Sequence, residues 1–308
     1  MQFVQQVVNG ITIGAFYALV ALGYTMVYGV LKLINFAHGD LFMWGAYLGL
    51  TGLSALVALV GGGSAWMVVP VMLVVILTIG LVGVLVERVA YRPLRTAGRL
   101  APVISALGVA FILESLARNV YGASWKTYPN VIALTGRITL GRPELGQGAA
   151  ASISVMQIIV LAVSFLLMGG LYLFVQRTRL GTAMRAVSLD HDVSRLMGID
   201  VNRIIAVVFL IGPGLGGAAG MIVGLYYGSF DFTLGWVFGL KAFIAAILGG
   251  IGNIPGAMLG GMILGIVETL GSGYISPQWK DVIAYLILIV ILIFRPTGLL
   301  GERVAEKL

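Results

Sequence analysis

Long apolar runs, separated by short polar segments, dominate the chain. They predict nine helices, at about 7–30, 41–60, 66–86, 101–119, 152–175, 202–227, 236–252, 255–271 and 280–294. Most of these runs approach the roughly 17–25 residues that a helix needs to cross a bilayer. We therefore predict an all-α polytopic membrane protein in which residues 1–308 form one transmembrane domain.

The seventh and eighth runs are separated only by the turn Gly252–Pro255. They form either two full spans or a re-entrant pair of half-helices, so eight or nine helices are transmembrane or re-entrant. Non-helical backbone at membrane depth is tolerated where it is buried in protein or lines a cavity. The sequence leaves both forms of this hairpin open.

The composition agrees with a membrane protein and excludes several classes of site. Hydrophobic residues make up 59% of the chain and charged residues 10%, whereas soluble domains carry about 25% charge. The absence of cysteine excludes disulfides, thiol catalysis and zinc–thiolate sites. Two histidines are too few for a histidine metal cage. The net charge of +7 is better explained by basic cytoplasmic loops than by nucleic-acid binding.

The basic residues predict the orientation in the membrane. Segments 87–99, 177–203 and 295–308 hold 12 of the 19 lysines and arginines, and such loops are usually cytoplasmic. Counting spans from them places the N-terminus outside and the C-terminus in the cytoplasm. Segment 120–151 is then an external loop. It is either a disordered connector or a docking surface with a small hairpin around Thr135–Gly136.

Segment 177–203 has the pattern of one or two short amphipathic helices. Met184 and Val187 recur at helical spacing, as do Val193 and Leu196. Asp190 and Asp192 would lie at a helix N-terminus and Arg195 towards the other end, with Gly198 as a C-terminal cap and Asp200 as the next N-cap. Such a helix lies on the membrane or inserts into a groove of a cytoplasmic partner, and we favour the partner. The candidate coupling residues are Gly181, Met184, Arg185, Val187, Asp190, Asp192, Arg195, Leu196 and Gly198.

Two groups of polar residues are candidates for a solute pathway. Asn35, His38 and Asp40 lie between the first two spans. They form either a helix break that lines the pathway or, as we favour, an ordinary turn with Gly39 as the permissive residue and Asp40 as the N-cap.

Lys241 and Glu268 form the second group. They lie at similar depths on either side of the 252–255 turn, within about 3 Å along the helix axes. A buried lysine needs a partner, so we expect an ion pair across the hairpin. The pair is either structural, which we favour, or in contact with the solute. Glu114 is a third intramembrane charge, for which the sequence offers no partner.

Small residues predict where helices approach closely. Gly212, Gly216 and Gly220 lie four residues apart, as do Gly256 and Gly260, and Gly261 and Gly265. This spacing lets two backbones come together. Pro213 should kink the sixth span because it removes a backbone donor.

Several segments, in order along the chain, resemble the Liv-type permeases of bacterial ABC importers for branched-chain amino acids. They are Gly23–Gly29, Ile34–Asp40, Glu87–Pro93, Arg179–Gly198, Gly239–Phe243, Leu248–Gly256 and Arg295–Gly301. The chain is most similar to the shorter of the two permease subunits, and 177–203 resembles the loop that docks on the ATPase.

The resemblance implies a multi-pass subunit of the bacterial cytoplasmic (inner) membrane. It implies a heterodimer with a second permease, two cytoplasmic ABC ATPases, and a periplasmic or surface binding protein that delivers leucine, isoleucine or valine. Close relatives of such permeases carry urea, amides or other amino acids, so these remain alternative solutes.

The sequence contains no phosphate-binding loop of the Gly-x-x-x-x-Gly-Lys-Ser/Thr type. ATP and Mg²⁺ would therefore bind to the partner ATPases, and we expect this chain to bind no cofactor and to be no enzyme. An ion-coupled transporter should contain a connected set of intramembrane acids, and only Glu114 and Glu268 qualify. A passive channel is a further alternative, whereas an intramembrane enzyme lacks a catalytic constellation.

Overall fold

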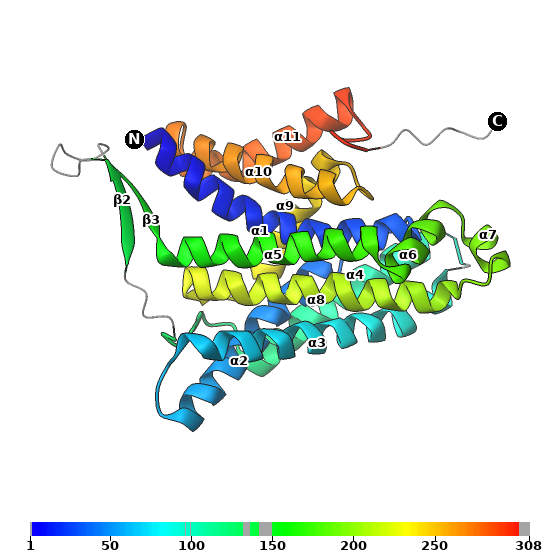
Figure 1. Cartoon of the computed structure of the whole chain (residues 1–308), viewed down its shortest axis with the longest axis horizontal. Coiled ribbons are helices and arrows are strands. Elements are labelled where there is room, and N and C mark those ends of the chain that lie inside the picture. Colours follow the sequence, from blue (N-terminus) through cyan, green and yellow to red (C-terminus); the bar gives the residue numbers. More distant parts are fainter. Residues whose placement is uncertain (1, 96, 99, 132–135, 142–149, 302–308) are drawn as a thin grey trace. The chain divides into compact units, whose positions relative to one another are not determined.

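The computed structural model describes residues 2–95, 97–98, 100–131, 136–141 and 150–301. All nine predicted apolar segments are helices within it (Figure 1). They are α1 (Gln2–Leu31), α2 (His38–Val60), α3 (Val68–Val86), α4 (Leu100–Tyr121), α5 (Val155–Arg177), α8 (Val201–Tyr227), α9 (Leu234–Gly249), α10 (Ile254–Tyr274) and α11 (Lys280–Phe294). Two short helices, α6 (Arg179–Leu189) and α7 (His191–Leu196), lie between α5 and α8. The prediction of an all-α membrane protein is confirmed.

Eight helical segments of the described chain are long and apolar enough to cross a membrane. The exception among the nine is α9, which has 16 residues, whereas α11 reaches 18 residues together with the helical turn Pro277–Trp279 before it. At a rise of ~1.5 Å per residue α9 is ~24 Å long, shorter than a hydrocarbon core of ~30 Å. It is followed at once by the 21 residues of α10. The hairpin therefore joins one short and one full-length helix, and is not a pair of equal half-helices.

The contacts of the chain group into two compact units that are interleaved in the sequence. The first unit comprises Met1–Thr25, Leu134–Met168 and Lys241–Leu308, and the second comprises Met26–Ala133 and Gly169–Leu240. Each unit is described by itself below. The expectation of one transmembrane domain stays a prediction.

In the second unit, α2 and α3 both pack against α8. A methyl group added to Gly45 of α2 would overlap the backbone of Gly217, and one added to Gly220 of α8 would overlap the Phe42 carbonyl. Pro213 lies inside α8, and its ring lies within 2.6 Å of where a Cβ of Gly83 would be. Small residues are therefore required where these helices touch.

In the first unit, α10 packs on α1 and on α9 through the predicted glycines. A Cβ on Gly10 would lie 2.6 Å from the Ile266 Cα, and one on Gly14 would lie 2.8 Å from the Met262 Cα. Gly261 and Gly265 face the backbone of α1 in return, and Gly260 faces the Ala245 carbonyl of α9. The predicted close approach is confirmed at Gly260, Gly261 and Gly265, whereas Gly10 and Gly14 were not predicted.

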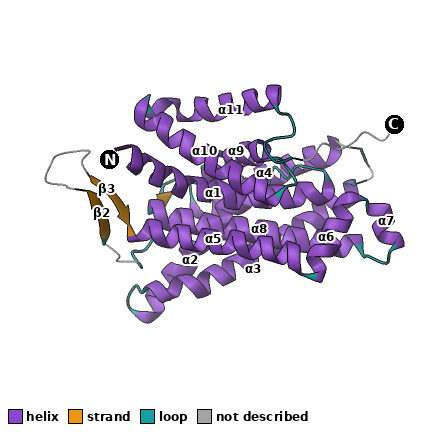
Figure 2. Ribbon diagram, turned by 45° about the horizontal axis from the view of Figure 1, so that its top comes forward, coloured by secondary structure: helices purple, strands orange, loops and turns teal. Residues whose placement is uncertain are grey.

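Segment 120–151 contributes to a strand pair that the sequence did not predict. β2 (Arg137–Gly141) pairs antiparallel with β3 (Ala150–Ser154), with Arg137 opposite Ser154 and Gly141 opposite Ala150 (orange arrows in Figure 2). The predicted hairpin around Thr135–Gly136 falls partly on residues 132–135, so it stays a prediction. Residues 132–135 and 142–149 lie outside the described residues.

A second strand pair ties two loops of the second unit together. β1 (Lys126–Thr127) pairs with β4 (Ser229–Phe230), just after the end of α8. Near the start of α8, Arg95 Nη1 donates to Asn202 Oδ1 at 2.8 Å. Segment 87–99 therefore adjoins one end of α8 and segment 126–127 the other, as the predicted topology requires. Which end faces the cytoplasm stays a prediction.

Candidate functional site

The coupling segment, residues 178–198, folds into two capped helices at one end of α8 (Figure 1). The Thr178 hydroxyl accepts from the Gly181 N–H at 3.0 Å and caps α6. The Asp190 carboxylate accepts from the N–H groups of Asp192 and Val193 at 2.9 and 3.1 Å and caps α7. The predicted caps after α7 are also present: Gly198 has φ +82°, and Asp200 accepts from the Arg203 N–H at 3.1 Å.

Burial divides the predicted coupling residues into two groups. Gly181, Met184 and Val187 are buried, and α6 packs on α8. Arg185 donates to the carbonyls of Val175 and Gln176 at 2.9 and 3.2 Å, so it caps the C-terminal end of α5. These four residues hold the coupling segment in place. Because Gly181, Met184 and Val187 are buried, they are not on the surface that a partner could contact.

An apolar patch remains exposed on the same segment. It consists of Leu189, Val193, Leu196 and Met197, with exposed fractions of 86%, 54%, 87% and 77%. Asp192 and Arg195 form an exposed ion pair of 3.4 Å beside it. Exposed apolar groups with polar neighbours mark an interaction surface. Of the predicted coupling residues, Asp192, Arg195 and Leu196 are exposed at or beside this patch, and their contact with a partner stays a prediction.

Lys241 forms the predicted ion pair and a second one that the sequence did not suggest. Its Nζ lies 2.7 Å from Glu268 Oε1 and 2.7 Å from Asp281 Oδ1. The Tyr17 hydroxyl donates to the other Glu268 oxygen at 2.8 Å, and the Lys241 ammonium lies 5.9 Å from the Tyr17 ring centre. Lys241 and Glu268 are buried, whereas the Asp281 side chain is 56% exposed. This cluster joins α1, α9, α10 and α11 of the first unit.

Asp281 was not predicted as a partner of Lys241, because positions along the helix axes were compared only between the two helices of the α9–α10 hairpin. α11 turns back on α10 after Ser276, and a Cβ on Gly271 would touch the Ile283 side chain. Measured from that turn, Glu268 and Asp281 are at similar depths. Counting residues from that turn along α11 could therefore have identified Asp281 as the third charge of the cluster.

The turn between α1 and α2 is built differently from the prediction. α2 begins at His38, its N-cap is Ala37, and Asp40 lies in the first turn. The prediction of Asp40 as the N-cap was therefore wrong. Its charge still lies at the end of a helix that favours anions. Gly39 has no left-handed backbone angle, and a Cβ there would lie 3.0 Å from the Gly239 Cα. A small residue is therefore needed here because α9 comes close, and not because the backbone of the turn requires a glycine.

Asn35 is held by a residue from the end of α3. The Tyr91 hydroxyl donates to Asn35 Oδ1 at 3.0 Å, and both side chains are buried. Tyr91 closes a π-helical turn, Glu87–Tyr91, that continues α3, and π-helical turns are frequent at functional sites. The buried carboxylate of Glu87, at the start of this turn, forms an ion pair with the partly exposed Arg95. Burial lowers the pKa of the Arg95 guanidinium, and the Glu87 carboxylate opposes that shift.

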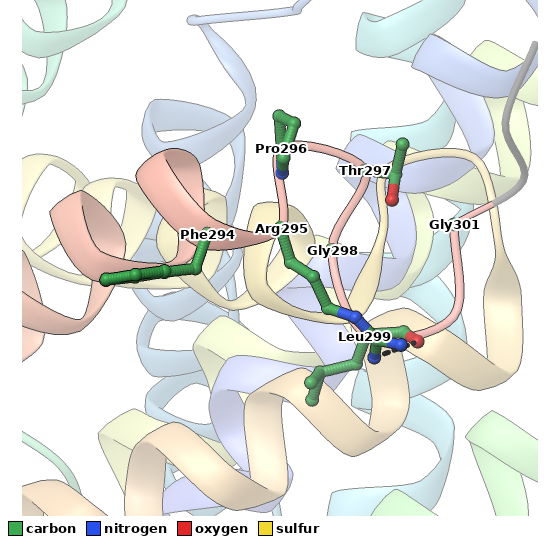
Figure 3. A pocket seen from close by; sticks show the side chains of 7 residues that line it. All are labelled: Phe294, Arg295, Pro296, Thr297, Gly298, Leu299 and Gly301. Atoms are coloured by element: carbon green, nitrogen blue, oxygen red, sulfur yellow. Dashed lines mark hydrogen bonds between the residues drawn. The ribbon is translucent and has the colours of Figure 1, made fainter.

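A hollow of about 210 Å³ lies against the turn that follows α11 (Figure 3). It is lined by Phe294, Arg295, Pro296, Thr297, Gly298, Leu299 and Gly301. The N–H groups of Leu299 and Leu300 donate to the carbonyls of Leu248 and Gly249 at 2.9 and 3.0 Å. This turn fastens the tail to the end of α9, and its lining offers no buried charge to a solute.

The comparison with known proteins decides the family. The family model described as "Branched-chain amino acid transport system / permease component" matches residues 6–292. The chain belongs to this family of permeases. It is 43% identical to the high-affinity branched-chain amino acid transport system permease protein BraD of Pseudomonas aeruginosa, over 99% of this chain and 98% of BraD. It is 41% identical to LivH of Escherichia coli K12, a permease protein described in the same words, over 100% of this chain and 98% of LivH.

A more distant relative is the probable branched-chain amino acid transport permease protein LivM of Methanocaldococcus jannaschii. It is 29% identical over 164 residues, which is 47% of this chain and 46% of LivM. No solved structure matches the chain.

In this permease the five predicted pathway residues form two clusters. Asn35, His38 and Asp40 belong to the second unit, and Lys241 and Glu268 belong to the first. Their contact with a solute stays a prediction. No group of three or more histidine or acidic residues that could hold a metal ion occurs in the part of the chain that the structure describes.

Proposed function

We propose that this permease is the shorter membrane subunit of an ATP-driven importer of branched-chain amino acids, leucine, isoleucine and valine, in the bacterial cytoplasmic (inner) membrane. The observation that carries the proposal is the apolar patch on the capped coupling segment, residues 178–198. A rigid amphipathic helix that exposes its apolar face suits insertion into a groove of a partner. The full-length similarity to BraD and LivH supports the choice of solute.

Two features of this chain bear on its partners: it contains no ATP-binding motif, and it exposes apolar surface. It contains no phosphate-binding loop, so ATP and Mg²⁺ would be bound by two ABC ATPases that dock at the patch from the cytoplasm. α11 is largely exposed, with Leu286, Ile289 and Ile293 among its uncovered residues. A second permease similar to LivM would complete the pathway as a heterodimer. An external binding protein would deliver the amino acid.

The import step would couple closure of the ATPases to a change in the permease. Pressure on α7 would be passed to α8 and α1, and the pathway would alternate between outward and inward access. Asn35, His38 and Asp40 would face the solute at one end of the second unit. Lys241 and Glu268 would hold the helices of the first unit together near the pathway.

Reconstituted vesicles test the proposal. The chain, its second permease, the ATPases and the binding protein are combined, and labelled leucine uptake is measured with and without ATP. We expect uptake that needs ATP, that survives an ionophore, and that unlabelled isoleucine and valine suppress. Uptake driven by an ion gradient without ATP would instead identify a secondary transporter. Competition by urea or an amide, with none by leucine, would reassign the solute within the same importer family.

A matched pair of variants tests the patch itself. Leu196→Glu places a charge in the patch, and Arg203→Gln changes an exposed residue in the first turn of α8, outside residues 178–198. We expect the first variant to lose co-purification with the ATPase and the second to keep it. Equal co-purification of both variants would remove the patch from the ATPase interface.

A further inference from the structure

His191 makes a hydrogen bond that connects the coupling segment to the end of α1. Its Nε2 lies 2.7 Å from the Val30 carbonyl oxygen, across 161 positions of sequence. A carbonyl only accepts hydrogen bonds, so this ring nitrogen carries the proton. Both residues belong to the second unit.

The bond supplies a hydrogen-bond donor to the C-terminal end of α1. The last four carbonyls of a helix have no partner inside it, and Val30 is the second-last residue of α1. The last turn of α1 contains no basic residue that could serve instead. A donor at this end also complements the partial negative charge of the helix terminus.

The position of His191 ties this bond to the apolar patch. It is the first residue of α7, directly after the Asp190 cap, and α7 is six residues long. Val193 and Leu196 of the patch belong to the same short helix. A partner that displaces the patch therefore displaces the imidazole with it.

The remaining anchors of the coupling segment lead elsewhere. Arg185 holds the end of α5, and α6 packs on α8. The His191–Val30 bond leads instead from α7 to the end of α1.

The chain beyond Val30 leads directly to the first pathway cluster. Lys32 directly follows α1 and has φ +55°, a left-handed angle that is unfavourable for a residue other than glycine. Asn35 follows three residues later and is held by Tyr91. The end of α1 is thus a short, strained connection between the coupling segment and the Asn35–Asp40 turn.

We propose that His191 is the positioning residue that transmits movement of the docked coupling segment to α1, through its hydrogen bond to the Val30 carbonyl, and so to the Asn35–Asp40 turn. The inference rests on the proposed function, because it needs a partner at the patch. It adds to that function that α1 receives the movement and that the His191 side chain transmits it.

The first test measures leucine imported per ATP hydrolysed in vesicles that contain the full complex. His191→Ala removes the donor, whereas His191→Gln supplies another side-chain N–H. We expect His191→Ala to retain the ATPase and hydrolyse ATP, with the leucine-to-ATP ratio reduced between about twofold and about tenfold. His191→Gln should restore most of the ratio, and the exposed control Arg203→Gln, in the first turn of α8, should leave it unchanged.

An unchanged ratio in His191→Ala, or an equal loss in His191→Gln, would overturn the proposal. ATP-independent uptake by the complex with the unaltered chain would instead refute the importer function, whatever His191 does. The two failures are therefore distinguishable.

A second test needs no transport and applies even if His191→Ala does not assemble. The chain has two histidines, so ¹⁵N NMR of the histidine-labelled permease gives two sets of ring signals. His191→Gln identifies those of His191. We expect a protonated, hydrogen-bonded Nε2, and a neutral ring protonated only on Nδ1 would overturn the proposal.

Discussion

Replacing Lys241 by methionine removes the cation that two carboxylates share. Glu268, with 5% of its side chain exposed, keeps only the Tyr17 hydroxyl of its two partners. Asp281, with 56% exposed, can be solvated in place of the lysine. Removal of one member of a buried ion pair typically costs about 3–5 kcal/mol, because the other charge stays buried without a partner. We expect Lys241→Met to lower the free energy of unfolding by about this amount.

Glu268→Gln should cost clearly less, and this asymmetry follows from the third charge. Lys241 still has Asp281 at 2.7 Å, and the glutamine oxygen can still accept from Tyr17. The loss is then about 1–3 kcal/mol, the cost of an incompletely satisfied buried polar group. The double variant Lys241→Met/Glu268→Gln should be more stable than Lys241→Met alone, because it contains no stranded buried carboxylate.

The assay is equilibrium unfolding of the purified permease in mixed micelles, followed by the fluorescence of its five tryptophans. Asp281→Asn is the control, and its half-exposed pair should contribute less than about 1 kcal/mol. Equal losses in Glu268→Gln and Lys241→Met would refute the sharing of the lysine. A double variant less stable than either single variant would refute the stranded charge as the cause.

Further predictions concern packing and sidedness. Gly265→Ala should lower the unfolding free energy, because its methyl group would overlap the backbone of Gly14, whereas Gly170→Ala meets nothing within 4 Å and should be tolerated. Equal stability of the two variants would contradict the close α1–α10 contact. Tyr91→Phe removes the hydroxyl that holds Asn35, so the unfolding free energy should fall by about 1–3 kcal/mol, and no change would show that this bond does not stabilise the turn. Because the chain lacks cysteine, Leu196→Cys can be labelled alone, and an impermeant maleimide should reach it only after cells are opened. Labelling in intact cells would reverse the predicted orientation.

Local structure along the chain could be predicted well. The caps Asp190, Gly198 and Asp200 act where the sequence placed them, because a cap depends on neighbours two or three residues away. The Lys241–Glu268 pair could also be predicted, since a tight hairpin fixes the relative depth of two helices. The pairing of β2 with β3 was not predicted, because β-prone residues indicate that strands exist but not which strands pair.

The sequence by itself determined that this protein spans a membrane, where its helices lie, and to which family of permeases it belongs. These properties depend on apolar length, on local caps and on residues in order along the chain. The tertiary structure decided which of the predicted residues touch which. It buried Met184 and Val187, exposed Leu189 and Leu196, and gave Lys241 a second carboxylate. It also brought His191 to the end of α1. A contact across 161 positions depends on how distant helices pack, and no local pattern of residues specifies that.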